Sequence, residues 1–270
     1  MVDASDNLGL WLPRVIDIAQ DAAEAIVEIY NRDFDIEHKD DKSPLTEADM
    51  AAHHLIVDGL KALTPAIPVL SEESADIPYT ERSRWQCYWL VDPLDGTREF
   101  IKRNGEFTVN IALIEDGQAI MGVIVVPVTK QCFYACRGQG AFRQDKGGDG
   151  QAIRARRLDP DNKCIVGSRS HAGERLKIFL ENVGDYELKS MGSSLKSCLV
   201  AEGKADIYPR LGPTSEWDTA AAQAIVEEAG GVITTLDMQR LRYNTKESLL
   251  NPEFLVIGDP EYDWARYLPD

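Results

Sequence analysis

Hydrophobic residues near the start of the chain recur at helical spacing. They predict an amphipathic helix of about five turns, in which Pro13 is tolerated only near the beginning. A second helix should follow Thr46-Glu47-Ala48-Asp49, because this segment matches a capping box with Thr46 as the N-cap. The residues that line these two helices are Leu12, Val15, Ile16, Ala19, Ala22, Ala23, Ile26 and Tyr30 in the first, and Ala51, Leu55, Leu60 and Leu63 in the second.

Short runs of β-branched and aromatic residues come next. Asp116-Gly117 between two of them reads as a hairpin turn. The N-terminal part is therefore expected to be α+β, with two helices on a mostly antiparallel sheet. The expected strands span residues 67–70, 88–91, 107–114, 120–126 and 132–135.

The composition changes between residues 137 and 157, which hold five glycines, six basic and two acidic residues. This segment reads either as a solvated loop or as a site for an anionic substrate, and it sets a domain boundary. We predict an α+β metal-binding domain over 1–150 and an α/β substrate-specificity domain with a partly parallel sheet over 151–270. In the second domain, helices are expected over 172–180, 194–202 and 219–229, and strands over 164–166, 186–188, 205–208 and 232–235.

Charge and cysteine content narrow the class of protein. The 270 residues carry 45 acidic and 29 basic side chains, a net charge of −16, which argues against binding nucleic acid. Five cysteines without a CxxC pair indicate buried thiols in a reducing compartment. Asp3 and Asp6 stand where a signal peptide needs positive charge, and no apolar run reaches the roughly 18 residues of a membrane span. We expect a cytoplasmic protein, and the sequence leaves open peripheral contact with the inner face of the cell membrane and a homodimer.

The densest chemical signal is an apolar strand that runs into two aspartates, in the segment 89–97. Pro93 and Gly96 favour a tight turn that presents Asp92, Asp95 and the intervening Leu94 carbonyl together. The amides of Gly96 and Thr97 would then open a short helix over 97–101, where phosphate is attracted. One turn could therefore hold a hard cation and a phosphate group, although each half of it alone also reads as an ordinary turn.

Further acids are expected at the same edge. Glu72 and Glu73 follow a second apolar strand, and Asp218 stands at the head of a predicted helix, where an N-cap is the alternative reading. Carboxylates without neighbouring histidine or cysteine favour Mg²⁺ over Zn²⁺. Such a site suits phosphoryl transfer, and the absence of a Walker sequence makes water the expected acceptor.

Four segments, taken in order, resemble the signatures of the inositol monophosphatase superfamily. The nearest branch is that of the CysQ-type 3′(2′),5′-bisphosphate nucleotidases, which segments 102–110, 168–171, 192–196 and 208–210 resemble. The resemblance implies a layered αβαβα sandwich. The four superfamily segments are Thr46-Glu47-Ala48-Asp49, Ser71-Glu72-Glu73, residues 92–97 and Glu216-Trp217-Asp218-Thr219-Ala220-Ala221.

The resemblance also implies roles for individual residues. Two or three Mg²⁺ ions would be held by Glu72, Asp92, the Leu94 carbonyl, Asp95 and Asp218. Thr97, hydrogen-bonded to Asp49, would help Glu72 activate the attacking water. The phosphate would contact the amides of Gly96 and Thr97, with Asp218 beside it, and the adenosine and second-phosphate pocket would be lined by His171, Ser193, Lys196 and Arg210.

The implied activity is removal of the 3′-phosphate of adenosine 3′,5′-bisphosphate (PAP), giving AMP and phosphate, with the 3′-phosphorylated sulfate donor (PAPS) as a second substrate. Two alternatives stay open. One is an inositol monophosphatase or sugar-bisphosphate phosphatase with the same metal site and a different pocket. The other is a non-catalytic module that binds nucleotide or metal, which the intact acidic set disfavours.

Overall fold

The computed structural model describes residues 7–32, 44–167 and 173–269. Its first sheet has seven strands in chain order, with β1 parallel to β2 and every later neighbour antiparallel. The mostly antiparallel sheet predicted from the sequence is confirmed. The strands are β1 (Val69–Ser71), β2 (Cys87–Asp95), β3 (Thr108–Glu115), β4 (Gln118–Val126), β5 (Gln131–Cys136), β6 (Ala141–Gln144) and β7 (Gln151–Ile153).

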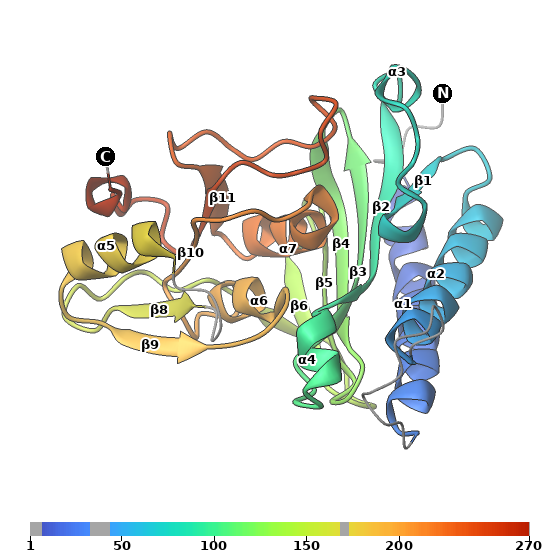
Figure 1. Cartoon of the computed structure of the whole chain (residues 1–270), viewed down its shortest axis with the longest axis horizontal. Coiled ribbons are helices and arrows are strands. Elements are labelled where there is room, and N and C mark those ends of the chain that lie inside the picture. Colours follow the sequence, from blue (N-terminus) through green and yellow to red (C-terminus); the bar gives the residue numbers. More distant parts are fainter. Residues whose placement is uncertain (1–6, 33–43, 168–172, 270) are drawn as a thin grey trace.

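Two long helices, α1 (Leu8–Tyr30) and α2 (Pro44–Leu63), cover one face of this sheet (Figure 1). The apolar stripe of α1 is buried as its spacing predicts, from Val15 to Ile26. Pro13 lies near the start of α1, where its missing N–H costs little. This apolar layer, built from both helices and one face of the first sheet, forms one of the hydrophobic cores.

The predicted cap of α2 is wrong. The helix begins at Pro44, so Thr46 lies inside its first turn and is not the N-cap. Proline is favoured at the first helical position because the N–H that it lacks would have no intrahelical partner there. Asp49 therefore does not take part in a capping box, and its carboxyl group interacts with Glu73 instead.

The second sheet has the strand order β11-β12-β10-β8-β9. Strand β8 is parallel to β9 and β10, whereas β12 is antiparallel to β10 and β11, which confirms the partly parallel sheet. Helix α5 (Glu174–Val183) and the 3₁₀ turn η3 (Ala265–Tyr267) pack on its outer side through an apolar cluster. The strands are β8 (Cys164–Gly167), β9 (Glu187–Ser190), β10 (Ile207–Arg210), β11 (Val232–Thr235) and β12 (Phe254–Ile257).

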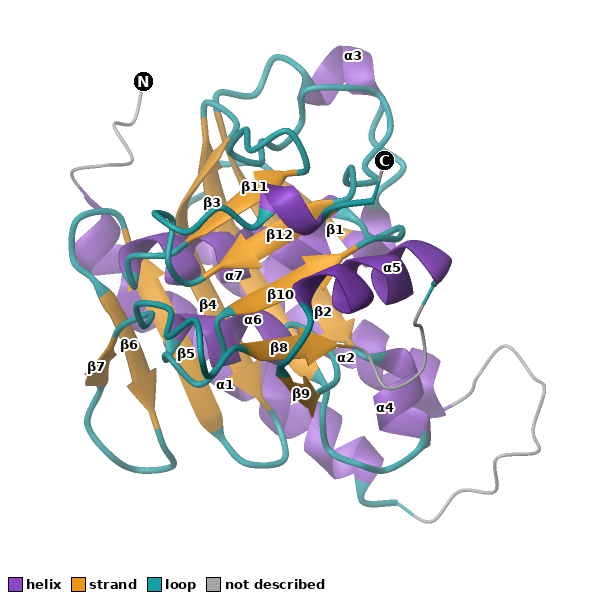
Figure 2. Ribbon diagram, turned by 90° about the vertical axis from the view of Figure 1, so that its left-hand side faces the viewer, coloured by secondary structure: helices purple, strands orange, loops and turns teal. Residues whose placement is uncertain are grey.

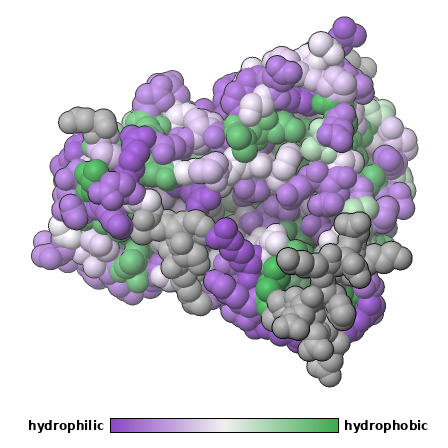
Figure 3. Space-filling view, viewed as in Figure 1, coloured by the Kyte–Doolittle hydropathy of each residue, from purple (hydrophilic) through white to green (hydrophobic). Residues whose placement is uncertain are grey.

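Helices α6 (Leu195–Ala201) and α7 (Glu216–Glu228) fill the layer between the sheets. Figure 2 shows the order of layers: the second sheet lies in front of α6 and α7, the first sheet behind them, and α1 and α2 behind that sheet. The αβαβα sandwich is therefore present. The face shown in Figure 3 is mostly hydrophilic, with hydrophobic side chains in smaller patches, as the high content of charged residues leads one to expect.

Segment 137–157 differs from the expected loop, because it contributes β6 and β7 to the first sheet. A further strand that the sequence analysis did not predict, β12, lies in the C-terminal part. The first sheet ends at Ile153 and the second begins at Cys164; the domain boundary at residue 150 stays a prediction.

In the described part of the chain, no helix combines the length and apolarity needed to cross a membrane. All five cysteines are free thiols, and only Cys87 is not fully buried.

Candidate active site

The irregular end of β2 forms the floor of the site. Asp92 is buried in this strand, and the pairing register with β3 shifts between Asp92 and Asp95, so the strand end bulges. The Leu94 amide donates a hydrogen bond to Asp92 Oδ1 (3.1 Å), which holds the turn closed. Gly96, at φ 102°, then directs the chain into the predicted short helix α4 (Thr97–Ile101).

Glu72 reaches the same edge from the neighbouring strand. It opens the 3₁₀ turn η2 (Glu72–Ser74) directly after β1, and β1 runs parallel to β2, so the carboxyl ends of both strands meet. Burial and the charge of Glu73 raise the pKa of Glu72, while hydrogen bonds with Asp92 and Trp217 lower it. The convergence of two strand ends predicted from the sequence is present.

Asp92 and Asp218 complete the acidic cluster. The pKa of Asp92 is raised well above its ordinary value by burial and by the charges of Asp95 and Asp218. Burial and the charge of Asp95 raise the pKa of Asp218 to about 7. Several carboxylates therefore face one another at close range and disfavour one another's charged forms.

Asp218 lies in the first turn of α7, but it is not the N-cap that the alternative reading suggested. The N-cap is Ser215, whose backbone amide donates to Asp218 Oδ2 (2.9 Å) in a capping box. This bond uses one carboxylate oxygen and leaves the other available to the site. A structural role and a role in the acidic cluster thus coexist in one side chain.

Asp49 joins the cluster from α2. Burial raises the pKa of Asp49 to about 8, and the charges of Glu73 and Glu72 act in the same direction. Its Oδ1 atom is buried without a hydrogen-bond partner. Thr97 lies exposed at the first position of α4, and its hydrogen bond to Asp49 stays a prediction.

The donor set fits a hard cation. It consists of carboxylate and carbonyl oxygens, which Mg²⁺ prefers, and Asp49 adds a buried oxygen without a hydrogen-bond partner beside them. Among the described residues, no three His, Cys, Asp or Glu side chains are already gathered into a group that could hold an ion. The fit to Mg²⁺ therefore rests on the chemistry of these oxygen donors and on the convergence of the elements that carry them.

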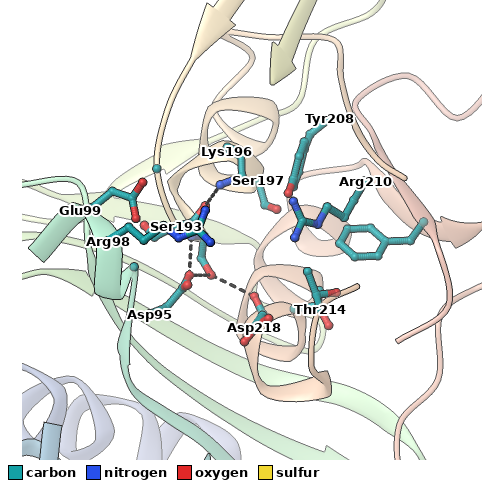
Figure 4. A pocket seen from close by; sticks show the side chains of 15 residues that line it. Asp95, Arg98, Glu99, Ser193, Lys196, Ser197, Tyr208, Arg210, Thr214 and Asp218 are labelled. Carbon is teal, nitrogen blue, oxygen red and sulfur yellow. Dashed lines mark hydrogen bonds between the residues drawn. The ribbon is translucent and has the colours of Figure 1, made fainter. Parts of the chain in front are cut away.

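A cavity of about 270 Å³ adjoins the acidic cluster (Figure 4). Asp95 and Asp218 lie on one side of it, and Lys196 and Arg210 reach it from the other. This separation of charge could bind a substrate with two anionic groups, one beside the acids and their cation and one beside the basic side chains. The lining residues are Asp95, Gly96, Arg98, Glu99, Gly192, Ser193, Ser194, Lys196, Ser197, Tyr208, Arg210, Thr214, Asp218, Thr219 and Phe254.

Two of the three basic side chains that line the cavity, Lys196 and Arg210, donate hydrogen bonds to backbone carbonyl groups. Lys196 Nζ donates to the Ser193 carbonyl (2.7 Å) and lies 5.3 Å from the ring centroid of Tyr208. Burial lowers the pKa of Lys196, and the charge of Asp95 opposes this shift. Arg210 Nη2 donates to the Pro213 carbonyl (2.8 Å), whereas its Nε is buried without a partner.

Of the two remaining residues predicted to line the nucleotide pocket, the structure describes Ser193 but not His171. Ser193 lines the cavity with a buried Oγ that has no hydrogen-bond partner, at a φ of 44°. This left-handed conformation is strained for serine and fits a position selected for function. His171 lies outside the described residues.

Several cavity residues were missed by the sequence analysis. Tyr208 and Phe254 form its aromatic wall, with ring centroids 6.1 Å apart at 88°. Tyr208 stands in one of the segments that carry the resemblance, next to Pro209-Arg210, and could have been found there. Phe254 lies on the unpredicted strand β12, so no signal pointed to it.

Comparison with known proteins supports this picture. Residues 11–260 match the model of the Inositol monophosphatase family. The 3′(2′),5′-bisphosphate nucleotidase CysQ of Salmonella typhimurium is 50% identical over 248 residues, which cover 91% of this chain and 98% of the relative. CysQ of Haemophilus influenzae is 37% identical over 261 residues, 94% of each chain.

Two solved structures are similar. The crystal structure of CysQ from Bacteroides thetaiotaomicron, a bacterial member of the inositol monophosphatase family, has a TM-score of 0.84 at 44% identity, covering 92% of this chain and 97% of that one. An inositol monophosphatase from Zymomonas mobilis has a TM-score of 0.78 at 23% identity over 99% of both chains and shows the shared fold.

Proposed function

Because this chain belongs to the inositol monophosphatase family, we propose that it is a metal-dependent phosphatase that removes the 3′-phosphate of adenosine 3′,5′-bisphosphate to give AMP and phosphate. The observation that carries the proposal is the division of one cavity into an acidic side and a basic side. The names of the similar CysQ proteins supply the nucleotide. PAPS, which carries a 3′-phosphate on the same ribose, is the proposed second substrate.

The ligands proposed for Mg²⁺ are Glu72, Asp92, the Leu94 carbonyl, Asp95 and Asp218, for two or three ions. Bound there, Mg²⁺ would polarise the phosphoryl oxygens and neutralise charge on the leaving oxygen. Hydrogen bonds at the end of β2 and in the first turn of α7 hold Asp92 and Asp218 on regular secondary structure, which limits their movement.

The reaction needs a water molecule in line with the bond that breaks. We assign its orientation to Thr97 and Asp49, and its proton to the Glu72 carboxylate, which lies in the same cluster. The water oxygen bonds to phosphorus while the bond from phosphorus to the 3′-oxygen breaks. The leaving oxygen then takes a proton from solvent and becomes the ribose 3′-hydroxyl.

Substrate choice is assigned to the basic side of the cavity. Lys196 and Arg210 would hold the 5′-phosphate, which is not cleaved, while the amides of Gly96 and Thr97 face the 3′-phosphate. Ser193, with its unpartnered hydroxyl, would bind the nucleoside. An inositol phosphate offers only one of these two phosphates and would leave the buried Lys196 without an anion.

The test is phosphate release from adenosine 3′,5′-bisphosphate, inositol 1-phosphate, fructose 1,6-bisphosphate and AMP, each with Mg²⁺ and with EDTA. We expect a preference of at least tenfold in kcat/KM for the first substrate and no turnover in EDTA. Preference for inositol 1-phosphate or fructose 1,6-bisphosphate would contradict the nucleotide assignment, and undiminished turnover in EDTA would contradict the metal assignment. Asp95→Asn should abolish turnover while the circular dichroism spectrum stays unchanged.

A further inference from the structure

Ser194 connects three other parts of the chain at the acidic cluster, where Figure 4 shows Asp95 and Asp218. Its hydroxyl lies 2.8 Å from Asp95 Oδ2 and 2.9 Å from the Asp218 carbonyl oxygen, and its backbone amide donates to Asp95 Oδ2 at 2.7 Å. From the first sheet, Asn110 Nδ2 donates to Ser194 Oγ at 2.9 Å. The network therefore joins the end of β2, strand β3, the start of α6 and the first turn of α7.

The direction of these bonds follows from the chemistry of the atoms. A carboxylate and a backbone carbonyl only accept, so the Ser194 hydroxyl is the donor in both contacts and shares its single proton between Asp95 Oδ2 and the Asp218 carbonyl oxygen. Asn110 must then present its NH₂ group to Ser194 and not its carbonyl oxygen. This agrees with the buried Asn110 Oδ1, which has no partner.

These hydrogen bonds restrict the orientation of the Asp95 carboxylate. Its Oδ2 accepts two hydrogen bonds from Ser194, so this oxygen is fixed and the carboxylate can rotate little. The other oxygen is thereby presented to the acidic cluster in one orientation. Ligating carboxylates that are held by such outer hydrogen bonds bind metal more tightly than free ones.

We propose that Ser194 is a positioning residue, whose hydroxyl and amide, supported by Asn110, orient the Asp95 carboxylate toward the cation site and tie it to α7. The proposal rests on the metal-dependent reaction proposed above. Ser194 lines the same cavity, but its hydroxyl is already bonded to Asn110, Asp95 and Asp218, so we assign its effect to Asp95. This distinguishes it from the adjacent Ser193, whose hydroxyl is unpartnered.

The experiment compares the wild type with Ser194→Ala, Ser194→Thr and a matched control, Cys198→Ala. Cys198 lies one turn further along α6, is also buried, and does not line the cavity of the acidic cluster. Binding of Mn²⁺ to the metal-free protein is followed by electron paramagnetic resonance, and kcat and KM are measured separately with saturating Mg²⁺. Circular dichroism verifies the fold of each variant.

We expect Ser194→Ala to weaken Mn²⁺ binding by roughly tenfold, the lower end for loss of an outer hydrogen bond, because the amide bond to Asp95 remains. Its kcat should fall while KM for the nucleotide changes less than about twofold. Ser194→Thr, which keeps a hydroxyl, should restore both properties, and Cys198→Ala should bind Mn²⁺ like the wild type. Mn²⁺ affinity unchanged in folded Ser194→Ala, or no recovery in folded Ser194→Thr, would overturn the proposal.

Asn110→Ala provides a second test that does not depend on the folding of Ser194→Ala. It should weaken Mn²⁺ binding in the same direction, and the double variant should bind no more weakly than Ser194→Ala alone, because both residues act through one bond. Wild-type affinity in Asn110→Ala, or fully additive losses, would contradict the network. A wild type that binds Mn²⁺ but hydrolyses no 3′-phosphate would refute the proposed function, whereas an active wild type with an unaffected Ser194→Ala refutes only the positioning role.

Discussion

At the scale of single residues, two acids in the first turn of α7, the half-buried Asp218 and the buried Glu216, have different partners. Asp218 belongs to the acidic cluster, whereas Glu216 Oε2 accepts the backbone amide of Asn244 at 2.8 Å. Burial raises the pKa of Glu216 to about 7, although this hydrogen bond and the charges of Lys246 and Arg82 oppose the shift. Glu216 therefore carries its proton more readily in the folded state than in the unfolded chain.

This difference predicts a pH-dependent loss of stability. Between the ordinary pKa of 4.5 and the folded value of about 7, the folded state holds a proton that the unfolded chain has released, so the free energy of unfolding falls as the pH rises. The contribution of Glu216 to this fall is at most about 3 kcal/mol. Glu216→Gln, which keeps a side-chain acceptor for Asn244 and cannot ionise, removes this contribution.

Urea unfolding at pH 5 and pH 8 measures the effect. Relative to the wild type, Glu216→Gln should gain stability between the two pH values, by as much as about 3 kcal/mol. The value at pH 5, where the wild-type carboxyl group is mostly protonated in the folded state, serves as the internal control. A stability difference that stays constant from pH 5 to pH 8 would show that Glu216 does not bury its charge.

At the scale of secondary structure elements, α7 packs so closely on the first sheet that one strand residue must be glycine. A Cβ atom on Gly122 of β4 would lie 2.2 Å from the Ala221 carbonyl oxygen, which belongs to the helix backbone. Neither backbone can move without shifting α7, and α7 carries Asp218. The helix that supplies a proposed ligand is thus held at a fixed distance from the sheet by a contact one turn beyond that ligand.

Gly122→Ala should therefore destabilise the protein by about 2 kcal/mol or more, because an inserted methyl group overfills a packed layer. Gly212→Ala is the matched control, since a Cβ there would meet nothing within 4 Å. Thermal unfolding should show a clear decrease in Tm for the first variant and almost none for the second. Equal Tm values would mean that α7 can move away from β4 without cost.

The elements that were predicted well are those whose structure depends on residues close together in the sequence. The apolar stripe of α1 and the turn from β2 into α4 can each be recognised within one short stretch of the sequence. Strands β6 and β7 were missed because the glycines and basic residues in and around these short segments read as a loop. Arg143 of β6 in fact bonds to Glu202, far along the chain, at 2.8 Å.

The acidic cluster was predictable for the same reason, since its members stand at strand and helix ends within recognisable motifs. Ser194 was not, although it lies beside Ser193 in a segment that carries the family resemblance. Its importance comes from partners separated from it by 84 and 99 positions, Asn110 and Asp95. No local pattern in a single sequence indicates which of two adjacent serines will meet them.

At the scale of the whole molecule, an ion pair with a buried carboxylate anchors the segment between the two sheets. Arg156 donates through Nε and Nη2 to the two oxygens of Asp206, each at 2.7 Å. Asp206 is 1% exposed and also accepts the Cys164 amide at the start of β8. The pair therefore ties the connection from the first sheet to the middle of the second sheet.

The adjacent Arg157 offers a comparison within the same segment. Its guanidinium lies 3.9 Å from Glu261, and the two side chains are 86% and 79% exposed. Exposed pairs contribute little, whereas removing one partner of a buried pair leaves an uncompensated charge. Arg156→Ala should cost about 2–3 kcal/mol of unfolding free energy, reduced from the full buried-pair value because the arginine side chain is itself 35% exposed.

Arg157→Ala should stay within about 0.5 kcal/mol of the wild type. Urea unfolding of both variants, followed by tryptophan fluorescence, measures the contrast; Trp264 is buried against the second sheet, and Trp89 lies in the first. If the anchor couples the sheets, Arg156→Ala should lower the midpoint of a single transition. Equal losses in the two variants would show that the connection is held by its backbone alone, and the two sheets would then owe their relative position to α6 and α7.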